Sequence, residues 1–498
     1  MTNTVPPSSE SSSSSEPKQP SGFRRELGLL SSTMIVVGSM VGSGIFIVSA
    51  DIARTVGSPA MLLLVWAATG LLTLIAALSY GELAGMMPEA GGQYVYLREA
   101  YNPLTGFLYG WTFFTVIQTG TIAAVAVAFA KFTAVIFPVF STSNILFTLG
   151  GFKVSAAQIL AIVSILVLTG LNLRGVRGGR LVQNVFTSAK VLGLAGVIVA
   201  GLLIGRNDTA ITKNMADFWH HAWIHIENGT VVSIEPLAGW SLLAAMGVAM
   251  VGSVFSSDAW NNITFAAAEV INPKRTIPLS LFLGTVIVTG LYIVANISYL
   301  VTLPLVGDPL AADALGRGIQ FATDDRVGVA AASVIFGSSA AGIMAVLIML
   351  STFGCNNGLI LAGARVYFAM SRDKLFFKRA GTLNERGVPA YALVIQAVWA
   401  SALCLSGTYG DLLDYVVFAI LIFYILTIAG IFVLRAKRPD AERPIKAFGY
   451  PVLPALYIVL ALAMCIDLLI FKPKFTYPGL ALVLSGIPVY FVWKRVQK

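Results

Sequence analysis

Small residues interrupt an apolar run close to the start of the chain. The stretch reads GSMVGSGIF, from Gly38 to Phe46, and the surrounding apolar run begins near Leu27. Glycine and serine are weak helix formers, and glycine adopts conformations that leave its N–H and C=O groups free. Free N–H groups attract anions and free C=O groups attract cations, so the stretch could bind a charged small molecule. Close helix packing through small residues is the alternative for one such stretch.

A related stretch later in the chain favours the binding interpretation. GVAMVGSVF, from Gly247 to Phe255, shares the letters MVGS with the first stretch. The two fall in the first and the sixth predicted membrane spans, which would cross the membrane in opposite directions. Paired glycine-interrupted spans in inverted halves are typical of the binding site of a secondary transporter. A zwitterion such as an amino acid would satisfy both the N–H and the C=O groups.

Two charged side chains fall well inside predicted spans, where ionisable residues are usually functional. Asp258 follows the second stretch. It could contact a substrate ammonium, or it could cap the second half of an interrupted helix, since aspartate is a favoured N-cap. Lys190 follows Arg180 by ten residues, which places it about 15 Å along a helix and too deep for easy snorkelling to the interface.

The composition indicates that membrane-spanning helices position these residues. The chain has 498 residues, of which 57% are hydrophobic and 11% are charged, far fewer charges than a soluble protein carries. Apolar runs of about 20 residues recur, each long enough to cross a bilayer core of roughly 30 Å. We therefore expect an all-α polytopic membrane protein. The spans are predicted at 27–50, 60–86, 104–138, 156–173, 181–205, 238–271, 276–303, 330–370, 389–407, 411–435, 450–471 and 475–494.

The net charge of +9 does not indicate a nucleic-acid partner, because the basic residues form short clusters between the apolar runs. Such clusters mark the cytoplasmic loops of membrane proteins. Arg24 and Arg25 precede the first span, and an even number of spans returns the C-terminus to the same, cytoplasmic side. The connection 304–327 is acidic and is predicted outside. The basic clusters are Arg174/Arg177/Arg180, Lys274/Arg275, Arg372/Lys374/Lys378 and Arg435/Lys437/Arg438.

The longest predicted outer loop, residues 206–237, contains the sequence FWHHAWIH, with all three histidines of the chain. His221 and His225 would lie one helical turn apart, but no further ligand follows from the spacing. We expect an interfacial aromatic belt with Trp219 and Trp223 rather than a metal site. The three cysteines, Cys355, Cys404 and Cys465, fall in apolar runs and indicate no disulfide framework.

Five stretches place the chain beside a known family. GSMVGSGIF, SYGELAGMMPEAGGQYVYLREAYNP, LVQNVFTSAK, FSSDAWNNITFAAAEVINPKRTIP and FGCNNGLILAGARVYFAMSRD occur in this order between about residues 25 and 440. The pattern resembles the amino acid–polyamine–organocation superfamily and is most similar to its L-type amino acid transporter branch. The resemblance implies the leucine-transporter fold, with five plus five inverted spans and two more, and amino acid transport by alternating access without a cofactor.

Residues 1–22 are rich in serine and proline, and we expect them to form a disordered cytosolic tail. With the predicted spans, the resemblance divides the rest of the chain into a first inverted repeat (23–205), an extracytoplasmic loop (206–237), a second inverted repeat (238–436) and a final region with two spans (437–498).

The resemblance also assigns the substrate-binding residues. The substrate carboxylate would meet Gly42, Ser43 and Gly44, and its ammonium would meet carbonyls near Met40, Phe255 and Asp258. Phe255 matches the aromatic gate of the family, with a packed core aromatic as the alternative. Ser256 and Ser257 stand where a bulkier residue is usual in the family, which leaves more room or more polarity around the substrate side chain.

Lys190 matches the position where sodium-driven relatives hold a sodium ion between spans one, five and eight. A fixed ammonium there would make transport independent of sodium, with Ser351 and Thr352 as neighbours. Alternatively, because burial favours the neutral form of a lysine, Lys190 could carry a transported proton.

These residues predict sodium-independent exchange of neutral or small L-amino acids. The alternatives are proton-coupled uptake, transport of cationic amino acids or polyamines, and, more remotely, a nutrient sensor or an intramembrane hydrolase using Ser43. Animal relatives attach a glycoprotein subunit through a cysteine after span three, and the loop at about 139–155 has none here. We therefore expect an amino acid substrate and a lipid bilayer as partners, but no disulfide-linked heavy subunit. A bacterial plasma (inner) membrane is the expected location, and the oligomeric state is left open.

Overall fold

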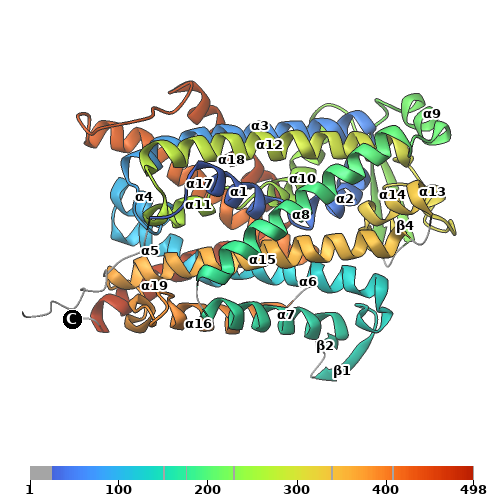
Figure 1. The fold of residues 1–498 in the computed structure, drawn as a ribbon. Coiled ribbons are helices and arrows are strands. Elements are labelled where there is room, and N and C mark those ends of the chain that lie inside the picture. Colours follow the sequence, from blue (N-terminus) through green and yellow to red (C-terminus); the bar gives the residue numbers. More distant parts are fainter. Residues whose placement is uncertain are drawn as a thin grey trace, which may run out of the picture.

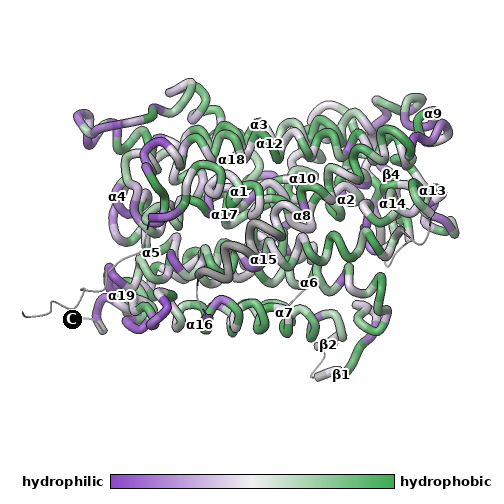
Figure 2. The backbone as a smooth tube through the Cα atoms, in the orientation of Figure 1, coloured by the Kyte–Doolittle hydropathy of each residue, from purple (hydrophilic) through white to green (hydrophobic). Residues whose placement is uncertain are grey.

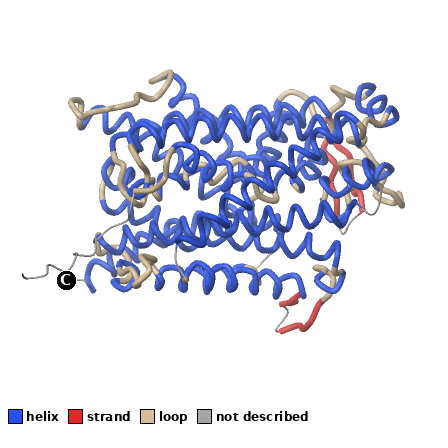
Figure 3. The backbone as a smooth tube through the Cα atoms, viewed as in Figure 1, coloured by secondary structure: helices blue, strands red, loops and turns tan. Residues whose placement is uncertain are grey.

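The computed structural model describes residues 25–149, 152–174, 176–227, 230–337, 340–406 and 409–496. The predicted tail of residues 1–22 and the basic Arg24 lie outside these ranges. Within the described residues the chain forms an elongated bundle of roughly parallel helices, and strands occur only in two short hairpins (Figures 1 and 3). The expectation of an all-α polytopic membrane protein is confirmed.

Nine helical segments of the described chain are long and apolar enough to cross a membrane, and Figure 2 shows their predominantly hydrophobic colouring. One of them combines α5, a short π-helical turn η2 and α6. They are α3 (Pro59–Met86), α5 (Pro103–Thr112) with η2 (Phe113–Ile117) and α6 (Gln118–Ile136), α7 (Ala156–Leu173), α8 (Val176–Leu203), α12 (Pro273–Thr302), α15 (Ala340–Arg372), α17 (Tyr409–Lys437), α18 (Val452–Phe471) and α19 (Pro473–Val496).

The other three predicted spans are short or broken helices. The ninth is α16 (Ala390–Leu403), and the first and sixth are both interrupted, as the sequence predicted. The first consists of α1 (Leu29–Met40), a 3₁₀ turn η1 (Gly44–Phe46) and α2 (Val48–Val56). The sixth consists of α10 (Trp240–Ser256), α11 (Asn262–Phe265) and a 3₁₀ turn η4 (Ala267–Glu269).

The second interruption does not lie within the glycine stretch that suggested it. Helix α10 continues through Gly252 and ends at Ser256, so the break follows the MVGS letters. A Cβ atom at Gly252 would lie 3.0 Å from the Cβ atom of Val48, and the Ser253 hydroxyl lies 2.7 Å from that of Thr69. For this stretch, close helix packing through small residues is therefore the correct interpretation.

The two ends of the bundle carry different connections (Figure 1). We name the end with α4 (Gln93–Ala100), η6 (Lys378–Gly381) and the last turn of α19 the α4 face. We name the opposite end the α9 face. It carries η3 (Pro138–Phe140), β1 (Ile145–Leu149), β2 (Phe152–Ser155), α9 (Asp208–Ala216), β3 (Ala222–Glu227), β4 (Thr230–Pro236), α13 (Ala314–Arg317), η5 (Thr323–Asp325) and α14 (Val327–Phe336).

Two predictions for the α9 face are wrong. His221 and His225 do not share a helical turn, because residues 222–227 form strand β3, paired antiparallel with β4. The predicted span 330–370 joins two separate helices, α14 and α15, which are parted near Gly337, a residue with a φ of 85°. Gly337 and the two serines that follow it mark this separation in the sequence, but the long apolar stretches on either side outweigh them in a hydropathy reading.

Backbone hydrogen bonds join the beginning of the first broken span to the end of the sixth. The N–H groups of Glu26 and Leu27 donate to the Glu269 carbonyl at 2.8 and 2.9 Å, and the N–H of Ile271 donates to the Leu27 carbonyl at 2.9 Å. We call this contact the main-chain clamp. It holds the two broken spans together at one end.

Candidate functional site

The end of α1 leaves a row of carbonyl groups that have no partner within the helix, as every helix C-terminus does. Four side chains from three other helices supply hydrogen bonds to them. The Lys190 ammonium donates to Gly38 O, the Cys355 thiol to Ser39 O at 3.2 Å, the Tyr292 hydroxyl to Met40 O at 2.9 Å, and the Ser351 hydroxyl to Val41 O at 3.5 Å.

Lys190 is a charged group enclosed by protein, with only 3% of its surface exposed. Its ammonium lies at the C-terminal end of α1, where the helix dipole favours a positive charge. The side chain extends from α8 to the end of α1, close to Cys355 of α15, and its role in transport stays a prediction. Thr352 was expected beside Lys190, but the hydrogen bonds described for its hydroxyl go to Ile348 O and Met349 O within α15, and not to Lys190 or α1.

Tyr292 connects the two interruptions. Its hydroxyl lies 2.9 Å from Met40 O at the first break and 3.1 Å from Ser256 O at the second. The ring packs edge-on against Trp66, with 5.2 Å between the ring centroids. The sequence did not single out Tyr292, because a tyrosine inside an apolar span carries no pattern of its own.

The first break lies tightly against the end of α10. A Cβ atom at Gly44 would lie only 1.9 Å from Ser256 Oγ and 3.0 Å from its Cα, so only glycine fits there without movement. At Gly42 the nearest atom would be Cys355 Sγ, at 3.3 Å. Ser43 is buried between them. The structure therefore brings Gly44 and Ser256, two residues predicted for one site, into direct contact.

Phe255, Ser257 and Asp258 form the edge of the second break, and all three are buried or nearly so. The capping role left open for Asp258 is not observed, because α11 follows Asn261 and has no side-chain cap. Instead, the Asp258 carboxylate accepts a hydrogen bond of 2.6 Å from the Tyr424 hydroxyl of α17.

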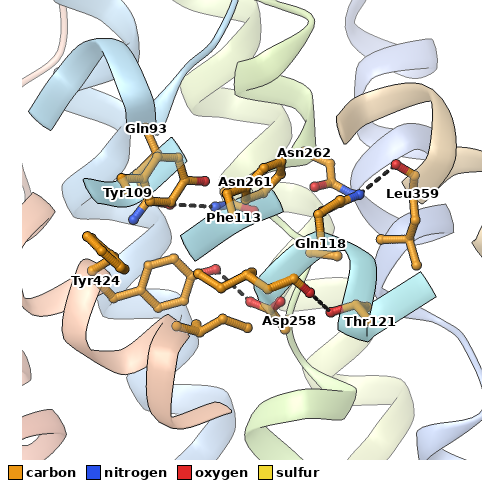
Figure 4. A pocket seen from close by; sticks show the side chains of 14 residues that line it. Gln93, Tyr109, Phe113, Gln118, Thr121, Asp258, Asn261, Asn262, Leu359 and Tyr424 are labelled. Atoms are coloured by element: carbon orange, nitrogen blue, oxygen red, sulfur yellow. Dashed lines mark hydrogen bonds between the residues drawn. The ribbon is translucent and has the colours of Figure 1, made fainter. Parts of the chain in front are cut away.

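A pocket opens beside Asp258, and the space around its lining that no protein atom fills, including the part open to solvent, is about 330 Å³ (Figure 4). The amide of Asn261 donates to Gln93 Oε1 at 3.1 Å, and the Gln118 amide donates to Leu359 O at 2.5 Å. Asn262 Nδ2 is buried without a hydrogen-bond partner. The lining residues include an acid and no basic residue: Gln93, Tyr109, Phe113, Ile117, Gln118, Thr121, Asp258, Ala259, Asn261, Asn262, Leu359, Ile420, Phe423 and Tyr424.

An ion pair closes the first broken span against the α9 face. Arg54 of α2 donates to Asp325 Oδ1 at 2.7 Å, and the Lys131 ammonium lies 3.9 Å from Asp325 Oδ2. Burial raises the pKa of Asp325, but the positive charges of Arg54 and Lys131 outweigh it and hold the pKa below its ordinary value. The carboxylate is therefore ionised at neutral pH.

Ion pairs also close the α4 face. Arg365 of α15 donates to Glu269 Oε1 at 2.6 Å, beside the main-chain clamp. Arg435 of α17 donates to Glu82 of α3 at 2.7 Å. Both ends of the broken spans are thus held by charge pairs, and the breaks lie enclosed between them.

Comparison with known proteins agrees with this architecture. A family model described as amino acid permease matches residues 27–491. The chain belongs to the amino acid permease family. It is 31% identical to the mouse (Mus musculus) large neutral amino acids transporter small subunit 2, over 99% of this chain and 86% of the relative. It is 29% identical to the human (Homo sapiens) b(0,+)-type amino acid transporter 1, over 96% of this chain and 90% of the relative.

Family membership makes this chain an amino acid transporter of the membrane and not an enzyme. The intramembrane hydrolase that the sequence left open for Ser43 is therefore set aside. The enclosed breaks of the first and sixth spans are the natural candidate for the transport site, because a backbone released from helical hydrogen bonding within a membrane is tolerated where it is buried in protein or lines a cavity.

Proposed function

We propose that this permease exchanges small neutral L-amino acids across the membrane by alternating access, without sodium. The observation that carries the proposal is the Lys190 ammonium bound to Gly38 O at the end of α1. A fixed cation at this helix end would take the position that the family resemblance gives to sodium, and the hydrogen bond to Gly38 O supports this. One relative is a transporter of large neutral amino acids by name, which supports a neutral substrate for this chain.

The substrate would lie between the two breaks. Its carboxylate would accept hydrogen bonds from the backbone N–H groups of Gly42, Ser43 and Gly44. Its ammonium would face backbone carbonyls near Met40 and Phe255. Phe255, at the end of α10, would close over it as the gate. The neighbouring Ser256 and Ser257 would leave a site of small, polar surroundings.

The orientation of the chain is also a proposal. Basic loops favour the cytoplasm, so we place the α4 face and both termini on the cytoplasmic side of a bacterial plasma membrane. Residues 23–205 and 238–436 would be the two inverted repeats, and the paired breaks in α1–α2 and α10–α11 support this division.

Exchange in proteoliposomes tests the proposal. Purified protein would be reconstituted without sodium and without a pH gradient, and vesicles preloaded with unlabelled alanine would be compared with empty vesicles. We expect uptake of labelled alanine only into preloaded vesicles. Uptake into empty vesicles that requires a proton gradient would overturn exchange and assign Lys190 to proton coupling.

Cationic amino acids are a second candidate substrate, favoured by the Asp258 carboxylate in a pocket that no basic residue lines. Asp258→Asn tests where this carboxylate acts. If it binds a cationic side chain, the variant loses lysine exchange and keeps alanine exchange. If it binds the α-ammonium that all amino acids share, both substrates lose affinity together.

We also propose that no disulfide-linked heavy subunit is needed, because the loop at about 139–155 contains no cysteine. The relatives named above include proteins called small subunits, so the point requires its own test. The chain expressed alone should reach the membrane and exchange amino acids in reconstituted vesicles. Activity that requires a co-purified, covalently linked protein would contradict this.

A further inference from the structure

A group of basic side chains forms a rim on the α4 face, and we propose that this rim binds the headgroups of anionic phospholipids. All members are exposed, and none pairs with a carboxylate among the residues that the structure describes. Figure 2 shows hydrophilic segments at this end of the bundle, near α19 and the start of α16. The basic rim consists of Lys374, Lys378, Arg379, Arg386, Lys494 and Arg495.

Two distant parts of the chain build the rim together. Phe377, between α15 and η6, packs against Trp493 of α19 with 5.0 Å between the ring centroids. This contact brings Lys494 and Arg495 beside the loop between α15 and α16. Phe377 is also 44% exposed, so an apolar surface accompanies the charges. Aromatic and basic side chains together are typical of the level of lipid headgroups.

The position of the rim favours a lipid over a soluble anion. Helix α15 ends at Arg372 and α16 begins at Ala390, so the loop emerges where two membrane helices end. Clusters of four to eight basic residues directly beside a membrane span typically bind anionic lipids. Arginine can grip a phosphate with two parallel hydrogen bonds, and lysine adds a point charge.

The backbone at Lys374 provides an independent observation. The N–H of Lys374 donates to Ser371 O at 3.0 Å, and the N–H of Leu375 donates to Met370 O at 2.8 Å, which is the Schellman ending of a helix. Its left-handed position usually holds glycine, but here Lys374 occupies it with a φ of 60°. A side chain in this conformation is disfavoured, and such residues concentrate at functional positions. Lipid binding gives the lysine a function that glycine could not provide.

The rim is also connected to the pocket. Asp373, the neighbour of Lys374, accepts hydrogen bonds from Arg98 and, at 2.7 Å, from the Tyr94 hydroxyl of α4. The first residue of α4 is Gln93, which lines the pocket and accepts from Asn261 at the second break. A lipid that holds the loop therefore also holds α4 against the pocket, and we infer that anionic lipid speeds exchange.

The test compares three variants in binding and in transport. The first is the triple change Lys374→Gln, Lys378→Gln and Arg379→Gln. The second is Lys374→Gly, which removes one charge and gives the helix end its preferred residue. The matched control neutralises three exposed basic residues of the α9 face, Lys153, Arg206 and Lys213, to glutamine.

Binding is measured by titrating fluorescent phosphatidylglycerol into protein in neutral detergent micelles. Each removed charge should weaken binding about fivefold, and the triple variant on the order of a hundredfold. Lys374→Gly should bind about fivefold more weakly while its unfolding temperature stays the same or rises. The control should match the wild type. A triple variant that binds within twofold of the wild type would overturn the proposed site.

Transport is measured as alanine exchange in phosphatidylcholine vesicles with and without phosphatidylglycerol. We expect phosphatidylglycerol to accelerate the wild type and the control, and to leave the triple variant unchanged. Equal wild-type rates in both vesicles would overturn the link between the rim and the pocket. Because the binding measurement involves no amino acid, it remains decisive even if the proposed exchange activity is wrong.

Discussion

Replacing Lys190 by methionine should slow exchange strongly while leaving the protein folded. Methionine fills similar space but has no ammonium to donate to Gly38 O. The end of α1 then loses its cation, and a buried carbonyl loses its donor. Since α1 forms one half of the candidate site, its position in each transport state should become less defined.

The size of the effect follows from the contact. A hydrogen bond to a charged group contributes about 1.5 to 3 kcal/mol, and a cation at a helix C-terminus about 0.3 to 2 kcal/mol. Release of the desolvation cost of the buried lysine offsets part of this. A net loss of about 2 to 3 kcal/mol corresponds to a roughly 30- to 160-fold slower exchange, at 1.36 kcal/mol for each factor of ten.

The assay is counterflow of labelled alanine in proteoliposomes, with the unfolding temperature measured on the same preparations. Lys153→Met, on the exposed strand β2, serves as the matched control and should exchange at the wild-type rate. Wild-type exchange by Lys190→Met would refute the reasoning. Slow exchange together with a collapsed unfolding temperature would refute it as well, because the lysine would then only stabilise the fold.

Three further predictions concern the contacts around the breaks. Tyr292→Phe removes one hydroxyl from two buried carbonyls and should cost about 1 to 3 kcal/mol, measured as slower counterflow; an unchanged rate would contradict the bridge. Gly44→Ala should raise the half-saturating alanine concentration because its Cβ would overlap Ser256 Oγ, and adding Ser256→Gly should partly restore it; no rescue would place the cause elsewhere. The pKa of Asp325 lies below its ordinary value near 4, so its pair with Arg54 should persist from pH 8 to pH 5 and be lost only as the pH falls through that lowered pKa. Asp325→Asn should therefore leave the shape of the exchange profile between pH 5 and pH 8 unchanged.

The sequence allowed the broken first span to be predicted because its signal is local. Gly42 and Gly44 stand together in an apolar run, and few arrangements other than a break or close packing explain them. The burial of Lys190 was predictable for a similar reason, since its distance from Arg180 fixes its depth. The same local reasoning failed at Gly252, where the small residues serve helix packing and the helix continues.

The residues that complete the site could not be predicted, because their roles depend on distant partners. Tyr292 and Cys355 lie in ordinary apolar spans, and their acceptors are about 250 and 316 residues away in the sequence. Asn262 and Gln93 line the pocket only because α4 and α17 pack around the second break. A single sequence contains such contacts only as a consequence of the whole fold.

The main-chain clamp between residues 26–27 and 269–271 is made entirely of backbone atoms. Side-chain substitutions other than proline therefore leave its donors and acceptors in place, so the two broken spans can stay joined while the sequence around them drifts. Selectivity could then be re-engineered, or altered in evolution, at the breaks and in the pocket without separating the two broken spans at this end. Specificity would change by point substitutions, and the mechanical linkage would be inherited unchanged.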